Sequence, residues 1–191
     1  MNLTSTLGAC ALALLLAGCG TTIELNKVPA DPARTIALQD NRKAEEKVYR
    51  RDGVRTPVQY FGDEDFDAPP LSQFSQLLGA RLPAGNYALH VDQFRVIDIY
   101  PQRLAATTAA GLTGALGGLG YSAFFTPEYS TTQDNITCLI SGNLQSKDIR
   151  GSASVPYKIS PFAGLVKNDP AFKSAANECL NLLSDKVAKA L

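Results

Sequence analysis

The sequence predicts an α+β fold, a single compact domain in which two helices pack on one face of an antiparallel sheet. The last segment, 170–190, carries apolar side chains at helical spacing behind Asp169 and Pro170, two residues that favour the start of a helix. Residues 87–100 carry the longest strand pattern, and residues 136–159 have the pattern of a β-hairpin. This order of strands and helices is typical of an α+β domain.

The first half of this domain contains three further elements. A first strand over 35–39 ends at Asp40-Asn41-Arg42, and the mostly polar stretch 43–68 contains a short strand over 57–61. Leucine and phenylalanine recur at helical spacing over 70–82, behind two prolines that suit a first helical turn. These patterns predict two strands followed by a helix.

The second half is predicted to be mostly sheet. Apolar and polar side chains alternate from Tyr87 onward, and the alternation slips at Gln93-Phe94, which predicts a β-bulge there. The hairpin strands are expected over 136–146 and 151–159, with Lys147–Arg150 as the connection between them.

The composition of the 191 residues excludes some functions. Lys plus Arg equals Asp plus Glu at 18 each, and the isoelectric point is about 6.6. A protein that binds nucleic acid through phosphate contacts needs an excess of basic residues, so we expect no nucleic-acid partner. The single histidine excludes a zinc site built on two histidines.

The first 18 residues predict export from the cytoplasm. They carry no charged side chain, and their apolar run over 11–18 is shorter than the roughly 20 residues that span a bilayer. Such a run is typical of the apolar core of a secretory signal peptide. It ends in Leu16-Ala17-Gly18-Cys19.

These four residues resemble the lipobox of bacterial lipoproteins. The resemblance implies cleavage before Cys19, a diacylglycerol on its thiol and a third acyl chain, such as palmitate, on its freed amine. Three chains exceed the two signals that stable anchoring needs. Gly20 in second place implies sorting to the outer membrane. The predicted organisation is therefore a signal peptide over 1–18, a lipid-anchored tether over 19–34 and a periplasmic domain over 35–191.

Two cysteines, Cys138 and Cys179, remain in the mature domain, since Cys10 is removed with the signal peptide. Cys138 lies on a predicted strand and Cys179 on the apolar face of the last helix. Because that helix must pack on the sheet, the two thiols can meet, and an oxidising compartment favours a disulfide. Two independent buried thiols are the alternative. The apolar face consists of Phe172, Ala176, Cys179, Leu183, Val187 and Ala190.

Candidate catalytic and metal-binding residues are few. Asp63, Asp65 and Asp67 alternate as at the start of a calcium loop, but the Gly and the bidentate Glu of an EF-hand are absent. We interpret them as a solvated acidic loop, with weak calcium binding as the alternative. His90 lacks a recognisable nucleophile motif, so we expect a partly exposed sheet histidine, no catalytic residues, no metal and no cofactor.

Two surface features suggest contact with a membrane or a partner. Arg50-Arg51 and Arg55 form a small basic cluster, interpreted as solvent-facing or as a contact for anionic headgroups. Residues 104–125 form an uncharged insertion rich in glycine and alanine. Packing against its own domain, contact with a membrane or partner, and an uninterpreted loop remain open for the insertion.

The order of these features resembles a group of small proteobacterial lipoproteins, which includes the YajG-like lipoproteins and the auxiliary lipoproteins of lipid-transport ABC systems. The shared features are the lipobox, an early strand ending near Asp40-Asn41-Arg42, the helix over 70–82, the strand Tyr87–Phe94 and the C-terminal helix. The resemblance implies a non-enzymatic envelope accessory protein that binds a partner protein or lipid. A periplasmic small-ligand-binding protein or hydrolase is the alternative.

Overall fold

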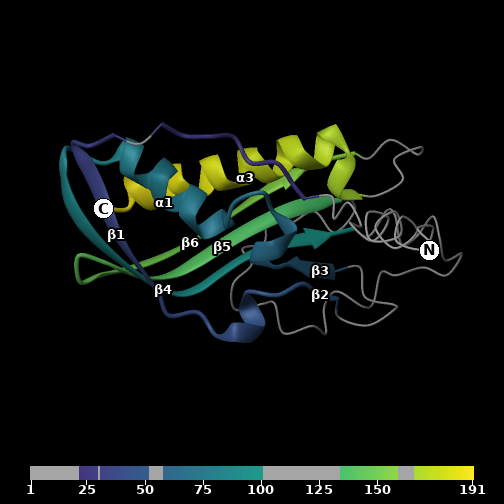
Figure 1. The fold of residues 1–191 in the computed structure, drawn as a ribbon, viewed down its shortest axis with the longest axis horizontal. Coiled ribbons are helices and arrows are strands. Elements are labelled where there is room, and N and C mark those ends of the chain that lie inside the picture. Colours follow the sequence, from purple (N-terminus) through teal and green to yellow (C-terminus); the bar gives the residue numbers. More distant parts are fainter. Residues whose placement is uncertain (1–21, 30, 52–57, 101–133, 159–165) are drawn as a thin grey trace, which may run out of the picture.

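The computed structural model describes residues 22–29, 31–51, 58–100, 134–158 and 166–191, which form one mixed layer of strands covered by two helices. The elements are β1 (Arg34–Asp40), β2 (Arg50–Arg51), β3 (Val58–Phe61), α1 (Pro70–Arg81), β4 (Gly85–Ile99), β5 (Asn135–Leu144), β6 (Lys147–Pro156) and α3 (Pro170–Lys189), with short 3₁₀ turns at Ala44–Glu46, Asp63–Asp65 and Val166–Asn168. Both helices lie on the same side of the sheet (Figure 1), and the predicted α+β fold is confirmed.

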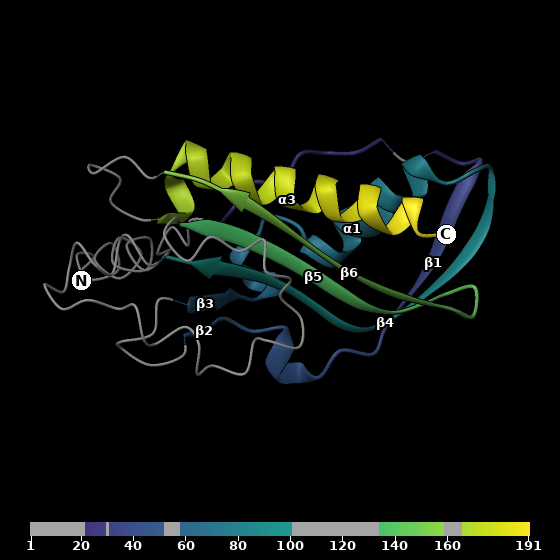
Figure 2. The same ribbon diagram turned by 180° about the vertical axis from the view of Figure 1, so that it is seen from behind.

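Strand β4 is the centre of the sheet. Its first half pairs with β1 and its second half with β3, while β5 runs along its other edge. Every pairing between named strands is antiparallel except that of β1 with β4, which is parallel. Figure 2 shows the same strands from behind, with α3 above β5 and β6 and α1 nearer to β1.

The predicted bulge in β4 is present. The register with β5 shifts between Val91 and Gln93, so that Asp92 is the extra residue. The bulge keeps Leu89 and Val91 before it, and Phe94 after it, in the same apolar core. Gly142 lies opposite, where a Cβ would collide with the backbone of His90, so the close approach of the two strands requires glycine.

The connection of the hairpin differs from the prediction. The strands β5 and β6 are joined by a two-residue turn at Gln145-Ser146, and Lys147–Arg150 belongs to β6. Both turn residues have positive φ, 49° for Gln145 and 66° for Ser146, as a tight type I′ turn requires. Asn-Gly is the usual sequence signal of such a turn. Because the sequence has Gln-Ser there instead, the pattern did not predict a turn at this position.

The core lies between the sheet and the two helices. Helix α3 begins as predicted: the Asp169 side chain accepts a hydrogen bond from the amide of Ala171, and Pro170 is the first helical residue. Its apolar face is buried as far as Val187, whereas Ala190 is exposed and lies beyond the last helical residue. Within the described ranges, no helix combines the length and apolar character that crossing a bilayer requires. The insertion 104–125 lies outside the described residues.

Candidate functional site

The segment 22–26, at the start of the described chain, is packed into the domain. Ile23 is 0% exposed and Leu25 is 7% exposed. Ile23 forms a parallel bridge with Phe66, in which its amide donates to the carbonyl of Asp65 and its carbonyl accepts from the amide of Asp67. We predicted that this part of the chain belongs to a tether. Instead, residues 22–26 are packed into the domain: Ile23 forms an isolated β-bridge, and Ile23 and Leu25 direct their alternating side chains into the core.

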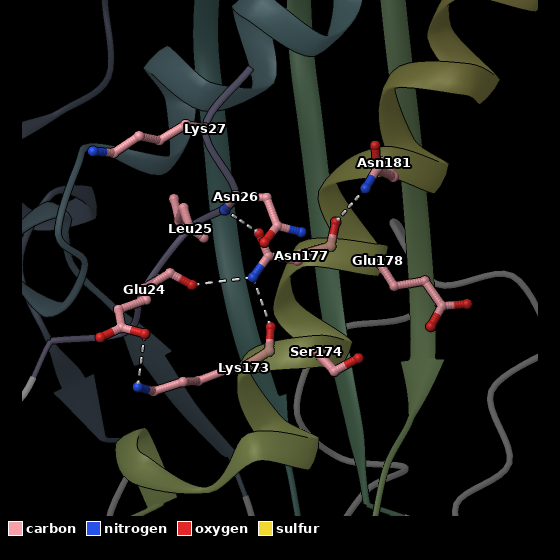
Figure 3. Close-up of a pocket in the computed structure, with 9 residues that line it drawn as sticks. All are labelled: Glu24, Leu25, Asn26, Lys27, Lys173, Ser174, Asn177, Glu178 and Asn181. Carbon is pink, nitrogen blue, oxygen red and sulfur yellow. Dashed lines mark hydrogen bonds and ion pairs between the residues drawn. The ribbon is translucent and has the colours of Figure 1, made fainter. Parts of the chain in front are cut away.

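Asn177 of α3 holds the other side of this segment. Its Oδ1 accepts from the amide of Asn26 at 2.7 Å, and its Nδ2 donates to the carbonyls of Glu24 at 3.1 Å and Lys173 at 2.9 Å (Figure 3). The Lys173 ammonium forms an ion pair with the Glu24 carboxylate at 3.3 Å. A carboxamide can donate and accept at once, so the Asn177 side chain satisfies two backbone groups of the 22–26 segment.

A groove of about 590 Å³ runs between the 22–26 segment and α3 (Figure 3). Its lining mixes lysines, glutamates and amides, and several of these groups already bond to one another across it. The lining consists of Glu24, Leu25, Asn26, Lys27, Lys173, Ser174, Asn177, Glu178 and Asn181.

The acidic loop at Asp63–Asp67 forms a structural junction of the domain. Asp65 is 3% exposed; it accepts from the amide of Gly62 and forms an ion pair with Lys167. Asp67 accepts from the amide of Leu25 at 2.9 Å, and Asp63 bonds to Arg42. The interpretation as a solvated loop was wrong for Asp65, which is buried and paired with Lys167, whereas Glu64 and Asp67 are exposed.

These carboxylates point to different partners. In the parts of the chain that the structure describes, no three His, Cys, Asp or Glu side chains converge in a way that could hold a metal ion. The loop thus joins the 22–26 segment to the rest of the domain, and the charges of Asp63 and Asp65 are paired with those of Arg42 and Lys167.

Arg42 is the most deeply buried cation among the described side chains, with 3% of its side chain exposed. It donates to both oxygens of Asp40, at 2.9 and 3.0 Å, and to both oxygens of Asp63 at 3.2 and 2.9 Å. Lys47 also pairs with Asp40 at 3.0 Å. The sequence pattern identified Asp40-Asn41-Arg42 as the end of a strand but carried no sign that Arg42 is buried.

The pKa values of this cluster reflect its pairing. Burial alone raises the pKa of Asp40, but the hydrogen bonds from Arg42 and Lys47 outweigh it and lower that pKa to about 2. Burial alone lowers the pKa of Arg42, whereas hydrogen bonds to Asp40 and Asp63 raise it above its ordinary value. Both groups are therefore charged throughout the physiological range.

The two cysteines predicted to meet lie at disulfide distance. Cys138 on β5 and Cys179 on α3 are both 0% exposed, and their Cα atoms are 5.9 Å apart, inside the range that a disulfide spans. The predicted contact between the helix and the sheet at these positions is confirmed. Cys19 lies outside the described residues.

His90 lies in the first half of β4 and is partly exposed, as expected. Its strand partners are Gln39 on β1 and Asn143 on β5, and no hydrogen bond or ion pair joins its side chain to another described residue. Neither the groove along α3 nor a second groove of about 350 Å³, between β1 and α1, is lined by His90.

The described end of the domain around Ile23 therefore brings together three features: the 22–26 segment, the acidic junction and the start of α3. Comparison with known protein families, with curated proteins and with solved structures finds no match for this chain.

Proposed function

We propose that the chain is a lipid-anchored accessory protein of the bacterial cell envelope, which binds a partner protein or lipid in the periplasm and catalyses no reaction. The observation that carries this proposal is the position of Leu16-Ala17-Gly18-Cys19, whose cysteine lies four residues before the docked Ile23. A lipidated Cys19 would need only residues 20–22 to reach a folded domain.

The spacing determines how close to the membrane the domain would lie. Four residues span at most about 14 Å when fully extended. A domain attached in this way stays against the headgroup layer, in contrast to one on a long flexible linker. We therefore place the protein on the periplasmic face of the outer membrane, with the Ile23 end toward the lipid.

The cysteine pair supports an extracytoplasmic location. Disulfides persist in the bacterial periplasm and are rare in the cytosol. Cys138 and Cys179 lie at disulfide distance in the core, and a bond between them would tie α3 to β5 in an oxidising compartment.

The uncharged insertion 104–125 is the proposed contact for a partner protein or lipid. In the sequence the insertion lies between β4 and β5, whose ends pair with each other at Ile99 and Asn135. Deleting 105–124 tests this part: loss of membrane-protein crosslinks with an unchanged fold supports it. Unchanged crosslinks together with reduced stability would show that the insertion only packs on its own domain.

The alternative function, a periplasmic small-ligand-binding protein or hydrolase, would rely on the groove along α3. Its only hydroxyl among the lining residues is Ser174, and His90 lies elsewhere in the sheet. We rank this function second because Asn177 and Lys173 already bond to the 22–26 segment.

The experiment that tests lipid anchoring compares the natural chain with Cys19→Ser in a Gram-negative host. The natural chain is expected to incorporate labelled palmitate and to sediment with outer membranes. The Cys19→Ser variant is expected to lose the label. A variant that still carries palmitate, or a natural chain that never does, would overturn the proposal.

A further inference from the structure

The residues Val48, Tyr49, Arg50 and Arg51, called the 48–51 segment below, form an exposed apolar and basic strip at the edge of the sheet. Val48 is 49% exposed and Tyr49 is 43% exposed, and they are adjacent in the chain. The other large apolar side chains that are exposed in the described ranges, Leu38, Leu182 and Leu191, do not adjoin one another in sequence. Adjacent exposed apolar side chains beside cations are typical of interaction surfaces.

The two arginines of the segment are held in position by aromatic rings. The Arg50 guanidinium lies 4.3 Å from the ring centre of Tyr60, and that of Arg51 lies 5.7 Å from the ring centre of Tyr100. Such cation–π contacts orient a guanidinium but leave its charge in place. Both arginines are exposed and belong to β2, the terminal strand on this side of the sheet.

Two carboxylates near the strip, Glu64 and Glu46, have partners within the domain. Glu64 accepts a hydrogen bond from the amide of Tyr49, and Glu46 pairs with Arg95 at 2.7 Å. The stretch from Lys43 to Arg51 carries four cations against two carboxylates, Glu45 and Glu46. The local balance is positive although the whole chain is neutral, which suits an anionic surface.

A row of aromatic side chains connects the strip to the docked Ile23. The ring centres of Tyr49 and Phe61 are 6.2 Å apart, and those of Phe61 and Phe66 are 6.1 Å apart. Phe66 is the bridge partner of Ile23. Lys167 connects the same two regions, since it pairs with Asp65 and lies 5.8 Å from the ring centre of Tyr49.

We propose that the 48–51 segment rests on the anionic phospholipid surface of the membrane, with Tyr49 in the headgroup layer and Arg50 and Arg51 against lipid phosphates. The inference rests on the proposed lipid attachment at Cys19, which would bring this end of the domain to the bilayer. Tyrosine favours the membrane interface because its ring is apolar and its hydroxyl is polar. Basic residues near an anionic membrane surface are attracted to it.

The chain contains no tryptophan, so one substitution supplies a unique fluorescent probe. The test uses the full lipidated protein with Tyr49→Trp, reconstituted in phosphatidylcholine vesicles with and without about 30% phosphatidylglycerol, an anionic lipid. Leu182→Trp is the matched control, because Leu182 lies on α3 and is 38% exposed. Brominated phosphatidylcholine serves as the quencher, and circular dichroism confirms that both variants fold.

The expected result is a blue-shifted emission for Tyr49→Trp and quenching about twofold stronger than for Leu182→Trp, as an aromatic side chain at the interface should show. The Arg50→Gln/Arg51→Gln pair in the Tyr49→Trp background is expected to remove the dependence on phosphatidylglycerol. Arg150→Gln/Lys158→Gln, a pair of exposed cations elsewhere on the domain, is expected to leave it unchanged.

Two different failures can be told apart. If neither tryptophan variant floats with the vesicles, lipid attachment itself fails. If both variants float but are quenched equally, the proposed membrane contact of the 48–51 segment is wrong, although lipid anchoring is supported. The same holds if Arg50→Gln/Arg51→Gln does not change the quenching of the tryptophan at position 49. Shielding of position 49 only when another envelope protein is added would assign the strip to a protein partner and overturn the lipid contact.

Discussion

Ile23 and Phe66 form a parallel β-bridge in which Ile23 is completely buried. The bridge fixes the chain four residues after Cys19, so that a lipid on Cys19 would be joined to the folded domain by a connection of at most about 14 Å. The orientation of the domain at the membrane would then follow from its own packing.

The first prediction concerns the packing of the 22–26 segment. Ile23→Ala is expected to lower the free energy of unfolding by about 2–5 kcal/mol, because it removes a fully buried side chain from the core. Glu24→Ala is the neighbouring control: 74% of the Glu24 side chain is exposed, and we expect a change within about 0.5 kcal/mol. Denaturant unfolding of the lipidated protein in detergent measures both. Equal midpoints for the two variants would mean that the segment is a tether after all.

The second prediction concerns Asn177, which holds the same segment from α3. Asn177→Ala removes the acceptor for the Asn26 amide and the donor to the Glu24 carbonyl. Tryptic cleavage after Lys27 requires local release of this chain, so we expect it to become faster by roughly tenfold for each 1.4 kcal/mol lost. Ser174→Ala, on the exposed side of the same groove, is expected to cleave at the original rate. A rate unchanged by Asn177→Ala would count against the docking.

The third prediction concerns Cys138 and Cys179. Titration of the purified mature protein, unfolded without reductant, is expected to find no free thiol, whereas two free thiols would refute the bond. The loop between the cysteines spans 41 positions, and the chain-entropy model gives about 4 kcal/mol for closing it. We therefore expect Cys138→Ala/Cys179→Ala to unfold at clearly lower denaturant concentration than the oxidised protein.

The fourth prediction follows from the pKa of Asp40. Its folded value of about 2 lies below the ordinary value of 3.8, so the pairing with Arg42 and Lys47 stabilises the fold above about pH 4 and is lost as the pH falls through 2. We expect Asp40→Asn to cost on the order of 1 kcal/mol at pH 7, after allowance for solvent screening, and far less near pH 2. Asp148→Asn, an exposed control on β6, is expected to show no such pH profile. A cost for Asp40→Asn that is independent of pH would contradict the assignment.

Local patterns in the sequence were sufficient to predict the main strands and both helices. The alternation along β4, its slip near Asp92 and the apolar face of α3 are all features of neighbouring residues. The prediction was wrong for the hairpin turn, because neither of the two residues with positive φ, Gln145 and Ser146, is a glycine.

The docking of the 22–26 segment was missed because it depends on residues that are distant in the sequence. Two apolar residues, Ile23 and Leu25, are too few for a strand pattern. The side chains that bind this segment are also far away in the sequence: Asp67 bonds to Leu25 from 42 residues away, and Asn177 bonds to Asn26 from 151 residues away. The burial of Arg42 likewise depends on Asp63, which is distant in sequence. The cysteine pair was predictable because a helix that packs on the sheet brings Cys179 to Cys138.

The mass of the N-terminal tryptic peptide tests the proposed anchoring most directly. The sequence has no Lys or Arg before Lys27, so trypsin releases a single peptide that ends there. We predict a peptide spanning 19–27 whose Cys19 carries a diacylglycerol and an amide-linked acyl chain. An unmodified peptide that begins at Met1, from protein purified out of a Gram-negative host, would contradict the lipid anchor and with it the proposed orientation at the membrane.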